Sequence, residues 1–208
     1  MRTFRKRAPR ALALTGAVTA AALLLAACGN DDPMKGMDHG GSPASSSAAP
    51  SSSSSASAGD FNDADVMFAQ MMIPHHQQAL EMAKLADGRA EDADIKRIVA
   101  AVEKAQDPEI QKMKTWLKGW GKPESAGMDH GMTGMMSERD MKDLAAAKGK
   151  DFDRKFAELM IAHHKGAVEM ARQEQKNGGN AEAKALAGEV VRAQEAEIAE
   201  LGKILDRL

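Results

Sequence analysis

The chain has 208 residues and a formal net charge of −2, which suits one folded domain with additional segments. This balance of charge gives neither the basic surface of a nucleic-acid-binding protein nor an acidic tail. Aromatic residues make up only 3% of the chain, so a base-stacking surface is not expected. Methionine occurs 15 times, and the residues between the loops are mostly good helix formers.

Residues 1–27 have the features of a bacterial secretory signal. Five basic residues precede an apolar run, which ends in small residues. The run is too short and wrongly flanked for a membrane span. Its ending, L-A-A-C, resembles a lipobox, which implies cleavage before Cys28 and attachment of lipid to the Cys28 sulfur. A plain signal peptide with an incidental cysteine is the alternative, and a lone cysteine excludes an intrachain disulfide.

Residues 28–59 are expected to form a flexible tether. They consist largely of serine, glycine and proline, and such a segment cannot bury enough apolar surface to fold. A coil of this length spans roughly 30 Å. We therefore expect a protein anchored by lipid to the extracytoplasmic face of the membrane, with a folded domain over residues 60–208 that stands away from the surface.

The folded part shows apolar residues at helical spacing, interrupted by turn residues rich in glycine. Helices are expected over residues 63–86, 92–118, 137–147, 151–176 and 181–207. The short third helix begins with a capping-box pattern, in which Ser137 is followed three residues later by Asp140. A methionine- and glycine-rich loop precedes it, and loop and short helix together occupy residues 121–148.

Two prolines fall inside expected helices. Pro74 directly precedes His75, and Pro108 lies in the second helix. A proline in a helix interior costs about 3 kcal/mol because it removes a hydrogen bond and crowds the preceding turn. The helical pattern keeps its phase across both prolines, so we expect kinks rather than breaks.

An internal repeat relates the two halves of this domain. The stretch MMIPHHQQALEMAK at residues 71–84 returns as LMIAHHKGAVEMAR at residues 159–172, an offset of 88. The helices that follow match at the same offset, so a helical hairpin has been duplicated. Two hairpins that each have one apolar face bury these faces by packing together. The expected fold is all-α: a ferritin-like four-helix bundle of hairpins 60–120 and 149–208, with a short extra helix between them.

The repeated stretch gathers methionine and histidine on one helix face. On a helical wheel, Met72 and Met82 share the side of His75, and His76 lies on its shoulder. Methionine stripes are usually core filler, and buried histidines are usually neutral and hydrogen-bonded. Duplication favours a metal site, because unpaired buried histidines are costly and both copies keep both of them. The candidate ligands are Met72, His75, His76, Met82, Met160, His163, His164 and Met170.

The ligand types favour copper. Di-iron bundles use Glu-x-x-His on facing helices, whereas this chain has Met-x-x-His, at Met72 to His75 and again at Met160 to His163. Thioether and imidazole together suit copper, especially Cu(I). A zinc site built from the four histidines is the alternative.

Methionine and histidine also recur where loops are expected. The sequence G-M-D-H-G occurs in the tether and again in the loop between the hairpins. A solvated segment has no core for methionine to fill. Methionine in such a segment is better explained as a soft, flexible metal ligand. Secondary candidate ligands are Met71, Met37, His39, Met128, His130 and Met132.

Three motifs in the sequence together indicate a resemblance to a known family. They are the doubled M-x-x-H-H…E-M-A pattern, the G-M-M-S-E-x-D-M segment and the Q-x-x-E-I pattern on the second helix of each hairpin. Residues 60–207 resemble the ferritin-like domain-of-unknown-function family three-zero-five, which includes CopM-like extracytoplasmic copper-binding proteins. The resemblance implies a helical bundle, copper binding for some members, and a ligand role for the eight residues given above. Leu159 stands where the first copy has Met71, so the two half-sites need not be equivalent.

We interpret the chain as a lipid-anchored copper-binding protein that sequesters the metal or passes it to a partner of unknown identity. No grouping typical of a covalent nucleophile is visible. A metal-dependent oxidoreductase on a ferritin-like bundle is one alternative, against which the missing Glu-x-x-His motif counts. The other is a structural lipoprotein in which methionine and histidine only fill the core.

Overall fold

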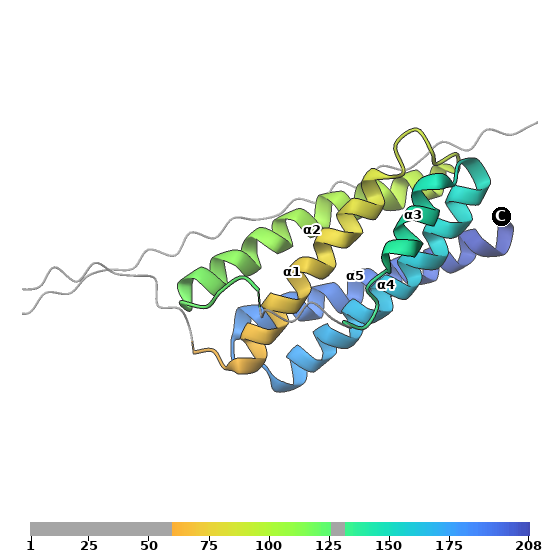
Figure 1. Cartoon of the computed structure of the whole chain (residues 1–208). Coiled ribbons are helices and arrows are strands. Elements are labelled where there is room, and N and C mark those ends of the chain that lie inside the picture. The colour runs from red at the N-terminus through yellow and green to blue at the C-terminus, as the bar shows by residue number, and fades with distance from the viewer. Residues whose placement is uncertain (1–59, 126–131) are drawn as a thin grey trace, which may run out of the picture. The chain divides into compact units, whose positions relative to one another are not determined.

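The computed structural model describes residues 60–125 and 132–208. Five helices and no strand occur in this part of the chain (Figure 1). They are α1 (Asp63–Lys84), α2 (Ala93–Gly119), α3 (Glu138–Ala146), α4 (Gly149–Asn177) and α5 (Ala181–Arg207). The expected all-α bundle is confirmed, and the predicted helix bounds are met to within two residues. None of the described helices is long and apolar enough to cross a membrane. The predicted signal, the tether and Cys28 lie outside the described residues.

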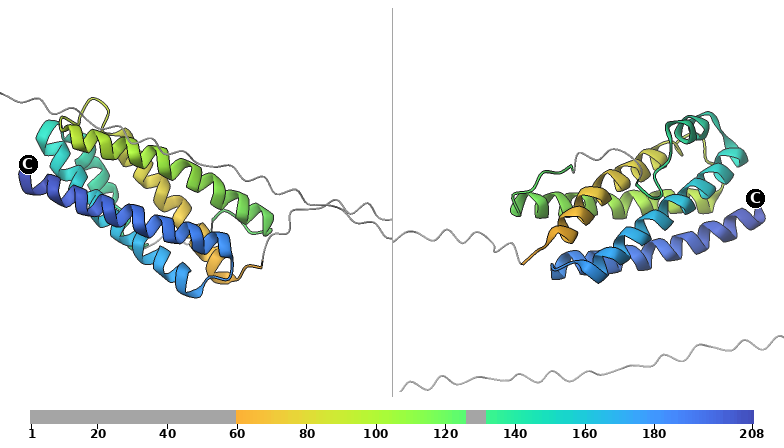
Figure 2. Two further views of the ribbon diagram at one scale, coloured as in Figure 1. Left: turned by 180° about the vertical axis from the view of Figure 1, so that it is seen from behind. Right: turned by 60° about the horizontal axis from the view of Figure 1, so that its bottom comes forward.

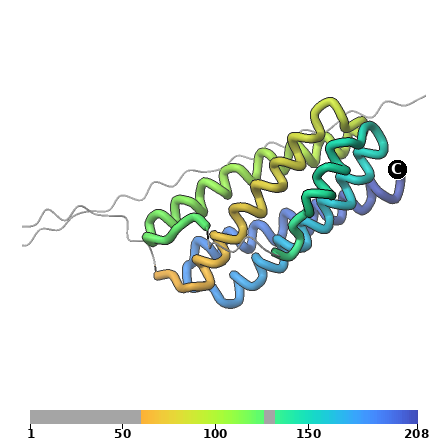
Figure 3. Tube along the Cα trace, in the orientation of Figure 1, coloured from red at the N-terminus to blue at the C-terminus, as the bar shows by residue number. Residues whose placement is uncertain are grey.

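The four long helices form two hairpins that lie against each other. Helix α1 packs along α2, and α4 packs along α5. The hairpins meet mainly where α1 crosses α4, with a smaller contact between α2 and α5 (Figure 2). The short α3 lies beside α4, after the connection between the hairpins, as the tube in Figure 3 shows.

Local sequence signals explain where these helices begin and why they continue. The Ser137 side chain accepts a bond from the Asp140 N–H, and the Asp140 carboxylate accepts one from the Ser137 N–H, so the predicted capping box is present. Pro74 lies within the uninterrupted α1 and Pro108 within the uninterrupted α2. The helices therefore run through both prolines, as the sequence pattern predicted.

Each hairpin caps a helix of the other hairpin through a buried aspartate. Asp65 on α1 accepts bonds from the N–H groups of Gly179 and Asn180, at 3.0 and 2.9 Å, where α5 begins. Asp153 on α4 accepts bonds from Glu91 and Asp92, at 3.2 and 2.9 Å, where α2 begins. Both carboxylates are fully buried. The two sets of residues are related by the 88-residue repeat, so the bundle has an approximate two-fold relation between its hairpins.

The apolar core consists of two clusters with histidines between them. The first cluster draws buried residues from 66–73 of α1 and 167–171 of α4, and the second draws them from 79–86 and 152–160. His75 and His76 lie in the gap between these segments on α1, and His163 and His164 lie in the matching gap on α4. A layer of histidines therefore separates the two apolar clusters along α1 and α4.

Candidate metal centre

The centre of this layer is a pair of closely packed histidine rings. The ring centroids of His75 and His163 are 3.8 Å apart across the contact between α1 and α4, and the rings are inclined by 39°. Both side chains are fully buried. No nitrogen of either ring meets hydrogen-bond geometry with a partner, although the Thr133 backbone lies close enough to His75, and the His75 backbone to His163, to act on their pKa. Such unpaired buried polar atoms are rare in folded proteins, and a bound metal ion would pair with them.

Both rings are held in the neutral form. Burial lowers the pKa of His75 to about 3, the nearby His76 and His164 act in the same direction, and the Thr133 carbonyl opposes them. Burial also lowers the pKa of His163 well below its ordinary value, again with help from the other histidines. A neutral imidazole keeps a lone pair on one nitrogen, which is the form that binds metals.

The other two histidines each contact a glutamate on the second helix of their own hairpin. His76 Nε2 lies 2.7 Å from Glu109 Oε2, and His164 Nε2 lies 2.7 Å from Glu197 Oε2. The two Nδ1 atoms are buried without a hydrogen-bond partner. A carboxylate at Nε2 favours the tautomer that carries its proton there, which leaves Nδ1 as the acceptor or ligand atom.

Sequence reasoning did not assign Glu109 and Glu197 to the site. The signal was present, because the two glutamates repeat at the same 88-residue offset as the histidines. Both glutamates are half-buried in the structure, whereas from the sequence alone a helical glutamate is easily taken for a solvated group. The contact across the hairpin identifies the pair as partners of the histidines.

The four predicted methionine ligands are buried but do not gather at one point. Met72 and Met170 belong to the first apolar cluster, whereas Met82 and Met160 belong to the second. Met72 and Met82 lie about 15 Å apart along α1, given a rise of 1.5 Å per residue. A single metal ion therefore cannot be held by all eight candidate residues. Met72 and Met160, one helical turn before the closely packed histidines, are the nearer pair along the helices.

A short segment of the connecting loop covers the closely packed histidines. Gln78 binds the backbone of Met136 with two hydrogen bonds, of 2.9 and 2.6 Å. On α4, a Cβ added at Gly166 would come within 2.1 Å of the Thr133 carbonyl oxygen. Gly134 has a φ of +87°, and a Cβ there would meet the His163 carbonyl oxygen at 2.9 Å. Glycine at both positions lets the loop lie directly on the turn that carries His163.

The secondary candidates are distributed differently. Met71 is half-buried against the first apolar cluster, and Met132 is half-buried in the covering segment. Met37, His39, Met128 and His130 lie outside the described residues. Within the described part, no three histidine, cysteine or acidic side chains converge to hold a metal. The four histidines therefore do not converge on one point in this structure.

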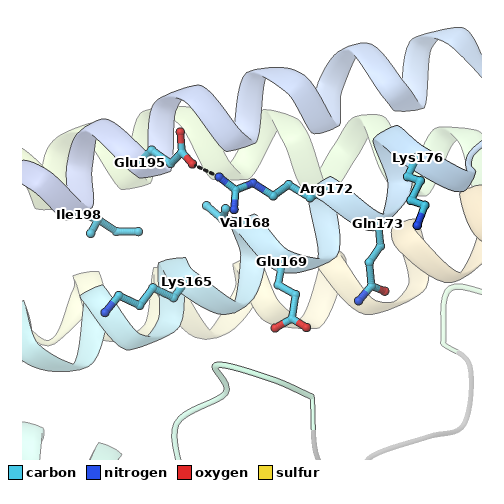
Figure 4. A pocket seen from close by; sticks show the side chains of 8 residues that line it. All are labelled: Lys165, Val168, Glu169, Arg172, Gln173, Lys176, Glu195 and Ile198. Carbon is cyan, nitrogen blue, oxygen red and sulfur yellow. Dashed lines mark hydrogen bonds and ion pairs between the residues drawn. The ribbon is translucent and has the colours of Figure 1, made fainter.

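A surface groove beside α4 does not contain this chemistry. A hollow of about 590 Å³ lies between α4 and α5, and its wall includes Lys165, Glu169 and Lys176 (Figure 4). Arg172 on this wall forms an ion pair with Glu195. No histidine or methionine lines it. Its charges are mixed and exposed, so it is a solvated surface and not the candidate site.

The bundle and its interior define the class of protein: a duplicated helical hairpin that encloses closely packed histidines with methionines on either side. The chain belongs to the family described as Domain of unknown function (DUF305), whose model matches residues 65–205. This confirms the resemblance noted from the sequence motifs.

Solved structures of the family show the same fold. A DUF305 protein from Streptomyces coelicolor is 32% identical, with a TM-score of 0.66, over 69% of this chain and 93% of that one. A DUF305 fragment from Deinococcus radiodurans is 30% identical, with a TM-score of 0.64, over 71% and 98%. CopM in its Cu(II)-bound form is 34% identical, with a TM-score of 0.62, over 69% and 96%. CopM has also been solved in Cu(I)-bound and Ag-bound forms. No curated protein matches the chain.

Proposed function

We propose that this chain binds copper as Cu(I) at the layer between its two hairpins, and that it stores or transfers the metal without a catalytic role. The observation that carries the proposal is the closely packed pair of fully buried histidines, none of whose four ring nitrogens has a partner at hydrogen-bond geometry. Their neutral form and the adjacent thioethers suit a soft monovalent ion. The copper- and silver-bound structures of the related CopM support the same metal class.

The proposed donors fall into an inner and an outer group. The inner group is His75 and His163, together with the thioethers of Met72 and Met160 one turn earlier on the same helices. The outer group is His76 and His164, whose Nδ1 atoms face no hydrogen-bond partner and whose Nε2 atoms are fixed by glutamates. Met82 and Met170 lie two turns beyond the histidines, and we assign them no contact with this ion.

The test is a competition titration with a chromophoric Cu(I) chelator under anaerobic conditions. The protein is the full chain with Cys28→Ser, which removes its one thiol. The comparison is the same chain with His75→Leu and His163→Leu, which keeps the volume of the core but removes the four unpartnered nitrogens. We expect the first protein to take Cu(I) from the chelator and the second to lose at least tenfold in affinity.

Equal affinity in the two proteins would contradict the proposal, provided that circular dichroism shows both to be folded. It would mean that the histidine layer is not the copper site. Failure of both proteins to compete would remove the Cu(I) assignment altogether. In that case a survey of metals that co-purify with the chain decides between zinc and no metal.

We also propose that the protein acts on the extracytoplasmic face of a membrane, anchored through lipid on Cys28. The lipobox-like sequence before Cys28 and the serine-rich residues 28–59 support this location. Metabolic labelling with a radioactive fatty acid is the direct test. Label on the native chain and none on the Cys28→Ala chain is the expected result, and unlabelled native protein would leave a plain secreted form.

A further inference from the structure

We propose a second soft-metal site, separate from the histidine layer, in a small pocket between the N-terminal part of α1 and the C-terminal part of α4. It would bind a monovalent soft cation, Cu(I) or Ag(I), through the thioethers of Met67, Met71 and Met170. The pocket has a volume of about 90 Å³, and all three methionines line it. It does not depend on the histidine site being occupied.

The arrangement of the lining residues is that of a site between two facing helices. Met67 and Met71 are four residues apart and share one face of α1, while Met170 and Glu174 share one face of α4 in the same way. Metal sites in helical bundles are built from such pairs on facing helices. Three thioethers are a soft donor set that favours Cu(I) over hard cations.

The exposure of Met67 is difficult to explain by packing alone. Its side chain is 50% exposed, and it is the one large apolar side chain on the surface of the described part of the chain. Met71 is half-buried and Met170 is 7% exposed. The thioethers therefore lead from the surface inward, which gives an ion access to the pocket from solvent.

Glu174 adds an acidic group to the same wall. Its side chain is 1% exposed, and neither carboxyl oxygen has a hydrogen-bond partner that meets bonding geometry. Asp65 lies close enough to share a hydrogen bond with this carboxyl, so the proposed donors are the three thioethers alone.

The internal repeat provides a comparison within the chain. The positions equivalent to Met67, Met71 and Glu174 are Lys155, Leu159 and Ala86, and only Met170 has a methionine counterpart, Met82. The second copy therefore packs the same helix crossing without these donor groups. Core packing at this helix crossing does not require methionine or a carboxyl. The methionines at the crossing of the first part of α1 with the last part of α4 are therefore better explained by metal binding than by packing.

The test follows the methionine methyl groups directly by NMR. The full chain with Cys28→Ser is labelled with ¹³C in the methionine methyl groups, and Ag(I) is added as a redox-stable probe of soft-metal binding. Resonances are assigned by single methionine-to-leucine substitutions. We expect the signals of Met67, Met71 and Met170 to shift together at one stoichiometry, with Met82 as the matched control that does not move with them.

Two variants separate this site from the histidine site. With His75→Leu and His163→Leu, the three signals should still shift, whether or not the proposed copper site at the histidines exists. With Met67→Leu and Met71→Leu, which gives position 71 the residue already present at 159, the Met170 shift should be lost while any response of Met72 and Met160 remains.

Three unmoved signals at saturating Ag(I) would overturn the proposal and return these methionines to a packing role. Signals that shift in the native chain but not in the histidine variant would also overturn it, because they would show one site rather than two. A broadening spread evenly over all methionines would indicate non-specific binding and count against the pocket as well.

Discussion

At the scale of single residues, the histidine layer lowers the free energy of unfolding of the metal-free protein. Unpaired polar atoms in an apolar interior cost free energy, and His75 and His163 bury four of them. His76 differs, because its Nε2 contacts the Glu109 carboxylate. The two kinds of histidine should therefore respond in opposite ways to replacement by leucine.

We predict that His75→Leu with His163→Leu raises the free energy of unfolding of the metal-free protein by about 1–3 kcal/mol. His76→Leu should lower it by a similar amount, since it leaves Glu109 without its partner. Urea denaturation in the presence of a strong chelator measures both changes. A loss of stability in the double variant would show that the closely packed rings contribute more by packing than their unpaired nitrogens cost.

The second residue-scale prediction concerns the glycine beneath the covering loop. Gly166→Ala places a Cβ against the Thr133 carbonyl oxygen, so the loop must move off α4 at a cost of about 1–3 kcal/mol. Gly202→Ala is the matched control, because nothing lies within 4 Å of that position in α5. The free energy of unfolding of the control should rise by up to about 1 kcal/mol, because alanine has a higher helix propensity than glycine. Thermal unfolding of both variants gives the comparison, and equal stability would mean that the loop does not rest on Gly166.

At the scale of helices, the reciprocal aspartate caps connect the two hairpins. Burial works to raise the pKa of Asp65, but its hydrogen bonds with Glu174 and the N–H groups of Asn62, Asn180 and Gly179 outweigh this and lower it. The carboxylate is therefore ionised where it meets the start of α5. A negative charge at a helix N-terminus is stabilising, and each cap is supplied by the opposite hairpin.

Loss of one cap should therefore loosen the helix of the other hairpin. We predict that Asp153→Ala lowers the free energy of unfolding by about 2 kcal/mol, because the N–H groups of Glu91 and Asp92 lose their acceptor. Hydrogen exchange should rise at the start of α2, although the substitution is on α4. Asp151→Ala, at an exposed position of the same helix, is the control. Unchanged exchange at the start of α2 would show that the cap does not hold the two hairpins together.

The helices were predictable from the sequence, whereas their cross-connections were not. Caps, turns and the 88-residue repeat are local signals, so the bounds of α1 to α5 and the doubled hairpin followed from them. The close packing of His75 on His163 and the crossing that puts Met170 beside Met67 depend on how α1 packs on α4. A helical wheel assigns a residue to a face of its own helix, but it does not say which residue on the facing helix it meets.

At the scale of the whole molecule, buried ionisable groups set the response of stability to pH. His75 is neutral in the folded state down to about pH 3 but gains a proton near pH 6.5 when unfolded. Stability therefore falls as the pH drops below 6.5, by about 2 kcal/mol for His75 at pH 5. His163 acts in the same direction.

Glu174 acts in the opposite direction. Burial and the nearby Asp65 raise the pKa of Glu174 to about 8, from an ordinary value of 4.5. The stability that this protonated carboxyl contributes is complete below pH 4.5 and is lost as the pH rises to about 8. Above pH 6.5 the two histidines no longer change the free energy of unfolding with pH. Of these three groups, Glu174 alone then determines how stability changes.

We therefore predict that the metal-free protein is most stable near pH 6.5 and loses stability towards pH 8. Glu174→Gln should remove the loss on the alkaline side but keep the loss on the acidic side. Glu169→Gln, an exposed neighbour on α4, should change neither. Urea unfolding of the three proteins from pH 5 to pH 8.5 is the measurement. If the free energy of unfolding of the unmodified chain did not change between pH 6.5 and pH 8, Glu174 would be ionised in the folded state.

The reciprocal caps also bear on how such a chain could have arisen. A lone hairpin would carry an aspartate with nothing to cap and a second helix without its cap, and two identical hairpins would supply each other. The present chain is thus equivalent to a two-fold dimer whose subunits have been joined into one polypeptide. In a dimer every mutation appears twice, so a feature on one side only cannot exist. Once the copies were joined, each could change alone, so Met67 and Met71 could be present in the first hairpin while the second has Lys155 and Leu159 at the equivalent positions.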